Sequence, residues 1–572
     1  MTPNQPFRLQ AVAVAVAAAC CSFAAQAQSP PAAFTPPVTP PSAGQVLREL
    51  QTPPAALPQA LPAARAEATA DSPDSGVRVL VKSVVITGNQ EVATADLMPL
   101  VASLVGAEQT VSQLNAAARR ITSLYRSRGF AVARALLPAQ DITSGAVTIA
   151  VIEGRIASSR LVNTTVLPDA VVNSYIADVK PGDVIRSAQI DRGLLLLQDT
   201  PGIASSRATL QPGASVGTSE LVIEVTPAAR LAGSVTLDNY GSRYTGEYRL
   251  GANLAVASPL GLGDQFSASA LTSGQGLKFA RAAYAAPLGS DGLRAELAYF
   301  ATRYELGREF AALDASGRAG STRVSVSYPF VRSAAANLSG GLSFESKRLN
   351  DQVNATATVT DKTVGITRIG LSGNRQDALG GGGLTTTDVS LGLGKLNIDS
   401  PSALRIDAAS AQTQGRYQVL SYALGRLQRV GSSTQLSVSF NGQLASRNLD
   451  SSEKFSLGGI SGVRAFPQGE ASGDEGTKAT LELRHSYSPN WQVTAFYDWG
   501  RVRINKNPFG PNASTTANSK TLGGVGVGLN ATFERVQLKA ALAWRTQCGT
   551  PTSLPAGAAK SPVVMVMASV GF

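Results

Sequence analysis

The sequence predicts an all-β transmembrane barrel preceded by two small α+β domains. From about residue 228 onward, apolar residues alternate with polar or small ones, as in Val536–Leu542, which is the period of a half-buried strand. The sequence contains 55 glycines, and only 16% of its residues are charged. Beyond the first thirty or so residues, the sequence has no apolar run of about eighteen residues that could form a membrane-spanning helix. Together these features are typical of a transmembrane β-barrel of about sixteen antiparallel strands.

The N-terminal residues 1–27 have the pattern of a secretory signal peptide. Arg8 supplies the positive charge, Ala11–Ala19 forms a short apolar core, and Ala25-Gln26-Ala27 is a small-x-small cleavage site. A lipoprotein signal through Cys20 is the alternative, although Ala17 stands where leucine is usual. Either way, the sequence predicts export from the cytoplasm.

Only one cysteine is expected in the mature chain. Cys20 and Cys21 would leave with the signal peptide, so Cys548 would remain alone. An intramolecular disulfide is therefore not expected, although an exported protein could form one.

Residues 28–76 are rich in proline and alanine and predict an extended tether. Within them, 42–51 has the pattern of a short helix: Ser42 can cap it, Gln45 stands where a capping box needs it, and Pro53 ends it. So short a helix is marginal alone and needs a docking site. The alternative is a transient helix in a linker.

Two segments, 77–154 and 155–227, repeat the order strand, helix, helix, strand, strand, with a period of about 75 residues. The first predicts strands at 79–87, 130–137 and 147–153 and helices at 94–105 and 111–128. The second predicts strands at 156–166, 203–210 and 221–226 and helices at 169–178 and 187–198. In the helix at 111–128, one face gathers Leu114, Ala118, Ile121 and Tyr125.

Residues 228–572 are assigned to the barrel, since about 21 residues per strand and connection gives about sixteen strands. Proline turns punctuate the segment at Pro259, Pro287 and Pro489, and Tyr328-Pro329-Phe330 predicts another. A soluble β-sandwich would show the same alternation with the opposite face buried. The signal peptide and the terminal aromatic residue, Phe572, favour the membrane barrel.

One arginine and one aspartate in this region predict an internal ion pair. Arg464 follows a run of glycines, and Asp498 lies on a later strand with Phe496 and Gly500 on the same face. A guanidinium fork matches a carboxylate, and we expect hydrophobic contacts to be scarce against a polar lumen wall. The pair is therefore expected to anchor a loop inside the barrel. The alternative is a surface loop with an unpaired arginine.

Several segments resemble a known family. ITGN at 86–89, YRSRGFAVARALLPAQDITSGAVTIAVIEG at 125–154 and LLLLQDTPGIASSRATLQPGASVGTSELVIEV at 194–225 resemble polypeptide-transport-associated (POTRA) domains. From about residue 42 to 572 the chain resembles the outer-membrane transporters of two-partner secretion (TpsB), of the hemolysin and filamentous-hemagglutinin type (ShlB/FhaC/HecB). The resemblance implies sixteen barrel strands, periplasmic POTRA domains and an N-terminal helix that plugs the pore.

The resemblance also implies a pore-loop anchor. In this superfamily, a long extracellular loop folds back into the pore with a Val-Arg-Gly-Phe/Tyr tip, which Val463-Arg464-Ala465-Phe466 matches with alanine in place of glycine. Phe496, Asp498 and Gly500 match the F-x-D-x-G motif of the inner wall. Phe572 matches the C-terminal insertion signal that the barrel-assembly machinery reads.

The function that follows is a pore in the bacterial outer membrane that recognises an unfolded exoprotein through its POTRA domains and exports it. The resemblance implies an adhesin or hemolysin as the exoprotein. A barrel-assembly factor of the same superfamily and a porin-like channel are the alternatives. The net charge of +11 is scattered along strands, so nucleic acid is not an expected partner.

An enzyme is not expected. The segment 213–217 matches the hydrolase pattern G-x-S-x-G, but it joins two predicted strands where that pattern needs a strand-to-helix turn. The only histidine, His485, lies on a predicted barrel strand. The sequence suggests no metal site and no cofactor.

Overall fold

The computed structural model describes residues 40–51, 78–510, 513, 517–546, 551–555, 557 and 559–572. The predicted signal peptide, most of the predicted tether and Cys548 lie outside these residues. In the described part of the chain, no helix combines the length and the apolar character needed to cross a membrane.

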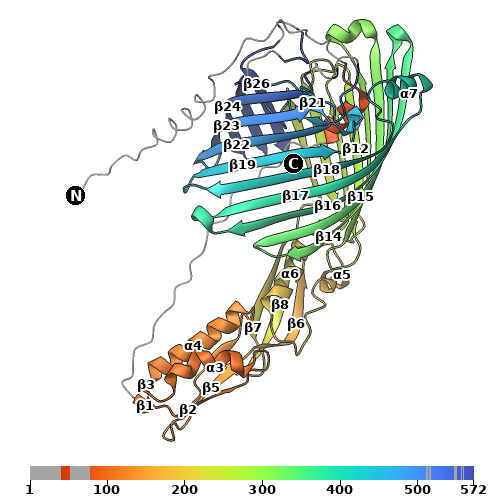
Figure 1. Cartoon of the computed structure of the whole chain (residues 1–572). Helices are drawn as coiled ribbons and strands as arrows, with labels where there is room; N and C mark the ends of the chain where they lie inside the picture. The colour runs from red at the N-terminus through yellow and green to blue at the C-terminus, as the bar shows by residue number, and fades with distance from the viewer. Residues whose placement is uncertain are drawn as a thin grey trace, which may run out of the picture. The chain divides into compact units, whose positions relative to one another are not determined.

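The first α+β domain packs two helices against a small sheet (Figure 1). Its elements are β1 (Arg78–Leu80), β2 (Ser83–Thr87), α3 (Thr94–Val101), η1 (Ala102–Leu104), β3 (Glu108–Thr110), α4 (Val111–Ser127), β4 (Arg134–Leu136) and β5 (Ala146–Ile152). The sheet order is β2-β5-β4, with β2 parallel to β5. α4 buries Leu114, Ala118, Ile121 and Tyr125, so the predicted apolar face of this helix is confirmed.

The second α+β domain repeats this topology. Its elements are β6 (Arg155–Asn163), α5 (Asp169–Ser174), α6 (Ser187–Gln198), β7 (Ile203–Pro212) and β8 (Thr218–Pro227). The sheet order is β6-β8-β7, and β6 is again parallel to the central strand. Residues 213–217, which match the hydrolase pattern, form the turn between β7 and β8.

The remaining chain forms a closed barrel of sixteen antiparallel strands, as the alternation predicted. In sequence order the strands are β9 (Leu231–Asp238), β10 (Arg249–Ala257), β11 (Gln265–Thr272), β12 (Leu277–Pro287), β13 (Arg294–Glu305), β14 (Ala315–Arg332), β15 (Ala336–Val353), β16 (Thr358–Asp377), β17 (Gly383–Ile398), β18 (Gly415–Arg429), β19 (Thr434–Ala445), β22 (Glu475–Ser488), β23 (Trp491–Arg503), β24 (Ser519–Phe533), β25 (Val536–Arg545) and β26 (Val563–Gly571). Because antiparallel strands alternate in direction, the connections fall at two ends. We call the end at which β9 begins the domain-side end and the other the far end.

One predicted turn is wrong. Tyr328-Pro329-Phe330 lies inside β14, and the pairing with β15 shifts register between Pro329 and Val331. Proline lacks a backbone N–H, so the ladder is interrupted there by a bulge instead of ending.

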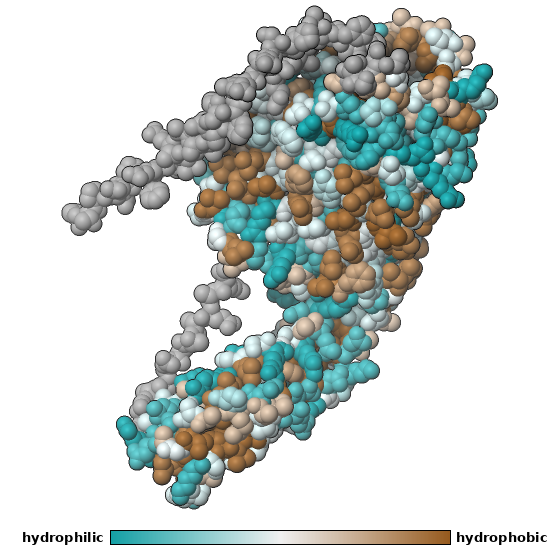
Figure 2. Space-filling view, viewed as in Figure 1, coloured by the Kyte–Doolittle hydropathy of each residue, from teal (hydrophilic) through white to brown (hydrophobic). Residues whose placement is uncertain are grey.

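Alternate residues along each strand point to opposite faces of the barrel, and the two faces differ in exposure and polarity. On β23, Val493 is 47% exposed while Phe496 and Asp498 are only 6% and 1% exposed. On the face seen in Figure 2, hydrophobic residues gather over the barrel strands, and hydrophilic residues gather at the far end, where α7 (Pro401–Ala408) lies. The apolar outer band suits the lipid, and the polar inner face suits an aqueous lumen.

The barrel closes where its last strand meets its first. β26 pairs with β9 over five residue pairs, whereas each other neighbouring pair in the barrel joins at least eight. Phe572 extends this ladder, because its backbone N–H donates to Gly233 O at 3.0 Å and its carbonyl accepts from Gly233 N at 3.1 Å. The ring of Phe572 lies over Gly233, where a Cβ would come within 2.3 Å of it.

Candidate functional site

The connection between β19 and β22 at the far end, residues 446–474, folds into the barrel, and we call it the pore loop. Its first limb, 446–457, and its second limb, 467–474, pair through the short strands β20 (Phe455–Ser456) and β21 (Ser472–Gly473). Glycines let the chain cross itself at the tip, since a Cβ at Gly462 would lie 1.8 Å from Leu457 O. Gly500 of β23 makes room for the loop, because the Leu457 side chain occupies the space that a side chain at this position would need.

The tip brings Arg464 onto Asp498 of β23. Arg464 Nε donates to Asp498 Oδ2 at 2.8 Å, Nη2 donates to Oδ1 at 2.8 Å, and the backbone N–H adds a bond to Oδ2 at 3.1 Å. Thr480 Oγ1 gives the same carboxylate a fourth donor at 3.0 Å. Because Asp498 is 1% exposed, this bidentate pair is shielded from water.

A second carboxylate, Glu482, was missed by the sequence analysis. Arg464 Nη1 donates to Glu482 Oε1 at 2.8 Å, and Arg484 donates to Glu482 Oε2 at 2.6 Å. The guanidinium also lies 3.4 Å from the centroid of the Phe496 ring. Glu482 shares the inward parity of Thr480, the cross-strand neighbour of Asp498, and that parity is the signal that could have identified it.

The expectation that hydrophobic contacts are scarce at the tip is wrong. Val463, Ala465 and Phe466 are buried in an apolar cluster that Leu457, Phe496, Val502, Leu522, Ala543 and Met565 complete. The barrel wall makes room for it with small inward residues: Gly524 faces Ala465, and Gly526 faces the Phe496 ring. Ala465 itself is not among the described residues with positive φ, so alanine fits its backbone without strain.

Further carboxylates hold the two limbs. On the first limb, Asp450 accepts from Lys362 Nζ at 2.7 Å, and Glu453 accepts from Lys347 Nζ at 2.6 Å and Arg368 Nη2 at 2.9 Å. These cations belong to β15 and β16. On the second limb, Glu470 contacts Lys520 of β24. The loop is therefore ion-paired to walls on both sides of the lumen.

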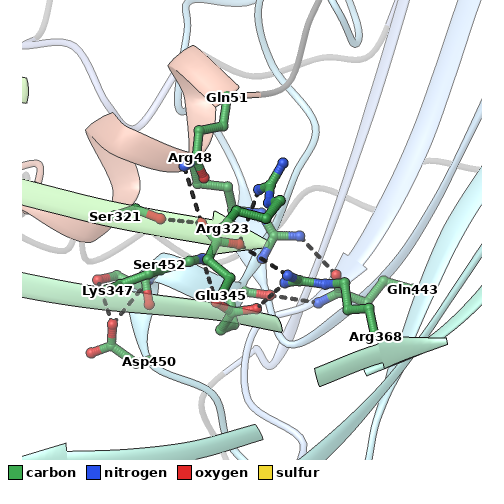
Figure 3. A network of polar contacts seen from close by, with 12 residues as sticks. Arg48, Gln51, Ser321, Arg323, Glu345, Lys347, Arg368, Gln443, Asp450 and Ser452 are labelled. Atoms are coloured by element: carbon green, nitrogen blue, oxygen red, sulfur yellow. Dashed lines mark hydrogen bonds and ion pairs between the residues drawn. The ribbon is translucent and has the colours of Figure 1, made fainter. Parts of the chain in front are cut away.

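The N-terminal helix α2 (Ala43–Gln51) is docked inside the barrel beside the first limb (Figure 3). Ala43 N donates to Asp351 Oδ1 at 2.7 Å, and Gln51 Nε2 donates to Glu345 Oε1 at 3.1 Å, both on β15. Ser42 Oγ lies 2.6 Å from Ser451 Oγ of the pore loop, and Gly44 packs against Ser452. The helix thus contacts both the wall and the loop.

Gln443 of β19 joins these parts, and it is 1% exposed. Its Oε1 accepts from Arg48 Nη2 of α2 at 2.8 Å. Its Nε2 donates to Glu453 O at 2.8 Å and to Asp474 O at 3.0 Å, so one amide holds the helix and both limbs. No sequence pattern marks this residue, because inward-facing glutamines are common on barrel strands.

The other residues singled out in the sequence lie elsewhere. His485 Nδ1 is 2.9 Å from Thr434 Oγ1 between neighbouring barrel strands, and Ser215 lies in the β7–β8 turn. The two are not brought together. Phe572, the last residue, is 57% exposed at the barrel closure.

Comparisons with known proteins agree with this arrangement. A family model described as haemolysin secretion/activation protein ShlB/FhaC/HecB matches residues 217–531, more than half of the chain. A model of the ShlB-type POTRA domain matches residues 79–154. The heme/hemopexin transporter protein HuxB of Haemophilus influenzae strain 86-028NP is 31% identical over 449 residues, which cover 77% of this chain and 79% of that protein. The outer membrane transporter CdiB of Dickeya dadantii is 25% identical over 413 residues, 70% of each chain.

Solved structures share the fold. CdiB from Escherichia coli superposes with a TM-score of 0.69 at 21% identity, over 92% of this chain and 95% of that one. BamA from Haemophilus ducreyi, lacking POTRA domains 1–3, has a TM-score of 0.50 at 12% identity over 87% of this chain, which is a likeness of fold. The transporters of this family work with a secreted exoprotein, and their POTRA domains are periplasmic, so the domain-side end is periplasmic and the far end extracellular. The chain belongs to the ShlB/FhaC/HecB family and is an outer-membrane pore of two-partner secretion.

Proposed function

We propose that this pore is closed at rest by α2, and that it opens when α2 leaves the lumen so that an unfolded exoprotein can pass. The docking of α2 carries the proposal. The helix is held by hydrogen bonds to Asp351, Glu345, Gln443 and Ser451, all of which could exchange with water. A net hydrogen bond contributes about 0.5–1.5 kcal/mol, so a contact of this size can be broken and remade.

The two α+β domains would receive the exoprotein in the periplasm. Each three-stranded sheet leaves edge strands, β2 and β4 in the first domain and β6 and β7 in the second, among the described residues. An extended polypeptide can add to such an edge by β-augmentation. The exported partner would belong to the β-helical class of adhesins and hemolysins, and its folding outside the cell would give the transport its direction.

Val463–Phe466, together with Phe496, Asp498 and Gly500, would act as the anchor of the pore loop. The loop must stay ordered in the lumen, and ordering one residue costs about 1–2 kcal/mol of conformational entropy. The bonds of Arg464 and the apolar cluster around Ala465 oppose that cost. Phe572 would serve as the insertion signal for the barrel-assembly machinery.

The plug is tested by single-channel recording in planar bilayers. Deleting residues 28–52, or combining Arg48→Ala with Gln51→Ala, is expected to raise the open probability, because each change removes bonds between α2 and the wall. Arg128→Ala is the control, since its exposed ion pair with Asp96 lies in the first α+β domain, away from the lumen. An unchanged open probability after the deletion would show that α2 does not close the pore.

A further inference from the structure

The second limb of the pore loop has its own anchor, the carboxylate of Glu470, which is 0% exposed. Oε1 accepts from Thr552 N at 2.9 Å and Thr552 Oγ1 at 2.8 Å, and Oε2 accepts from Ser553 N at 2.9 Å. Ser553 Oγ and Lys520 Nζ also donate to it. Five donors saturate a carboxylate, which has about four lone-pair sites.

These donors connect the second limb to the extracellular surface of the barrel. Thr552 and Ser553 belong to the connection between β25 and β26, and Lys520 belongs to β24. Ser553 O in turn accepts from Tyr244 Oη at 2.5 Å, in the connection between β9 and β10. The Tyr244 ring packs on Phe310 with centroids 4.7 Å apart. Glu470 therefore fixes the limb to two extracellular connections on either side of the barrel closure.

None of the donors to Glu470 comes from α2. In contrast, α2 donates three hydrogen bonds to the barrel wall: from Arg48 to Gln443, from Gln51 to Glu345, and from the backbone N–H of Ala43 to Asp351. α2 packs mainly along β13, β14 and β15, on the side of the first limb, and Arg48 also reaches Gln443 of β19. α2 also touches the second limb next to Glu470: Glu49 hydrogen-bonds Gln468, and Gln45 and Glu49 lie beside Gly469.

Departure of α2 would therefore have unequal effects on the two sides of the lumen. On the side of β13–β15 it would take one donor from each of Asp351 and Glu345 and uncover their carboxylates, to which Tyr304 and Arg323 still donate. The Glu470 cluster would stay complete. Carboxylates uncovered in this way draw in water and favour an occupant that donates hydrogen bonds. An extended polypeptide backbone, with an N–H donor at each residue except proline, is such an occupant.

We propose that Glu470 is a positioning residue for export: it keeps the second limb of the pore loop stationary, so that the exported chain passes along the wall of β13–β15 that α2 covers at rest. The proposal rests on the proposed departure of α2. It assigns the two limbs different tasks, since the limb near β15 borders the path while the limb near β24 remains a fixed wall.

Two cysteine pairs test this in full-length transporter carrying Cys548→Ser. The first pair, Glu470→Cys with Ser553→Cys, replaces the anchor by a disulfide. With a reductant present we expect secretion of the exoprotein to fall at least tenfold, and oxidation should restore at least half of it. If no disulfide forms on a non-reducing gel, a short bismaleimide takes its place.

The second pair, Ser42→Cys with Ser451→Cys, ties α2 to the first limb, where the two hydroxyl oxygens lie 2.6 Å apart. Oxidation of this pair should stop secretion, and reduction should restore it. Secretion through the oxidised second pair would refute the departure of α2. Normal secretion by the reduced first pair, or failure of its cross-linked form to recover, would overturn the role of Glu470 instead.

A second measurement applies if the variant with the first cysteine pair does not assemble into a barrel. Glu470→Gln keeps the size of the side chain but removes its charge, and Ser472→Cys reports the mobility of the limb by labelling with an impermeant thiol reagent. We expect labelling to rise at least tenfold in Glu470→Gln. Glu309→Gln is the matched control, because it removes an extracellular carboxylate paired with Arg243 outside the pore loop. Equal labelling in both variants would refute the proposal.

Discussion

Gly524 faces the tip of the pore loop, and the space above it is already filled. A Cβ at this position would lie 2.7 Å from Ala465 Cβ and 3.3 Å from Trp544 O. Carbon atoms in contact are normally about 3.5–4.0 Å apart, so Gly524→Ala forces the tip away by roughly an ångström. Overpacking of this kind costs about 1–3 kcal/mol. The ratio of docked to undocked tip should therefore fall by a factor between about 5 and 150.

Ala465→Gly should compensate, because it removes the atom that the new methyl group meets. The chain also offers a matched control: Gly528 lies on the same face of β24, and a Cβ there meets nothing closer than 3.5 Å. We therefore expect Gly524→Ala to reduce secretion, Gly528→Ala to be tolerated, and the double variant Gly524→Ala/Ala465→Gly to recover most of the activity.

The assay is the amount of exoprotein secreted per assembled barrel, with the barrel measured by its heat-modifiable migration on gels. Labelling of Ser461→Cys would report the undocked fraction of the tip directly. Normal secretion by Gly524→Ala, equal damage by Gly528→Ala, or no recovery in the double variant would each refute the packing argument.

The remaining predictions concern the ion pair, the C-terminus and the periplasmic domains. Asp498→Ala should impair secretion without removing the barrel, but less than Arg464→Ala does, because Glu482 still accepts a hydrogen bond from Arg464 at 2.8 Å. The double variant Asp498→Ala/Glu482→Ala should lose as much secretion as Arg464→Ala. Additive losses in the double variant Arg464→Ala/Asp498→Ala would show that the two residues act independently. Arg464→Lys should secrete little more exoprotein than Arg464→Ala, since an ammonium group cannot bridge two carboxylates as a guanidinium group does. Wild-type secretion by Arg464→Lys would contradict this role of the guanidinium group. Removing Phe572 should lower the amount of assembled barrel on gels, and unchanged assembly would show that the terminal aromatic is dispensable. Deleting 77–227 should abolish secretion while leaving a heat-modifiable barrel; continued secretion would mean that the exoprotein is received elsewhere.

The parts of the fold that depend on local periodicity could be predicted from the sequence. Alternation along the strands predicts the barrel, and the face of Leu114, Ala118, Ile121 and Tyr125 predicts a packed helix. The ends of the elements do not follow from periodicity. The strand predicted at 130–137 is only Arg134–Leu136, and the helix predicted at 94–105 ends at Val101, because local pattern does not specify where a backbone ladder stops.

The candidate site could be predicted only where a motif marks it. Arg464 and Asp498 are marked, and they lie in contact. Gly469-Glu470 also fits the family's loop pattern, but the pattern does not predict the partners of Glu470, Thr552 and Ser553. Gln443 is not marked, because its partners lie on α2 and on the pore loop. Parity shows that Gln443 faces inward, but which inward residues meet depends on the path of an irregular loop across the lumen. The apolar cluster around Ala465 was missed for the same reason: it joins the loop to small residues on strands that follow it in sequence.

The pairing of β26 with β9 has a consequence for how the barrel is made. Phe572 meets Gly233 across 339 residues of chain, since 572 − 233 = 339, so this contact has nearly the largest sequence separation available in the barrel. Contacts of such long range form slowly, because the loop they close must first be ordered. Until β26 pairs with it, β9 keeps a free edge of N–H and C=O groups that could pair with a strand of another molecule. Substituting Gly233 with valine, which displaces the Phe572 ring, should therefore delay closure and leave the newly made protein prone to aggregation and proteolysis before it reaches its mature form.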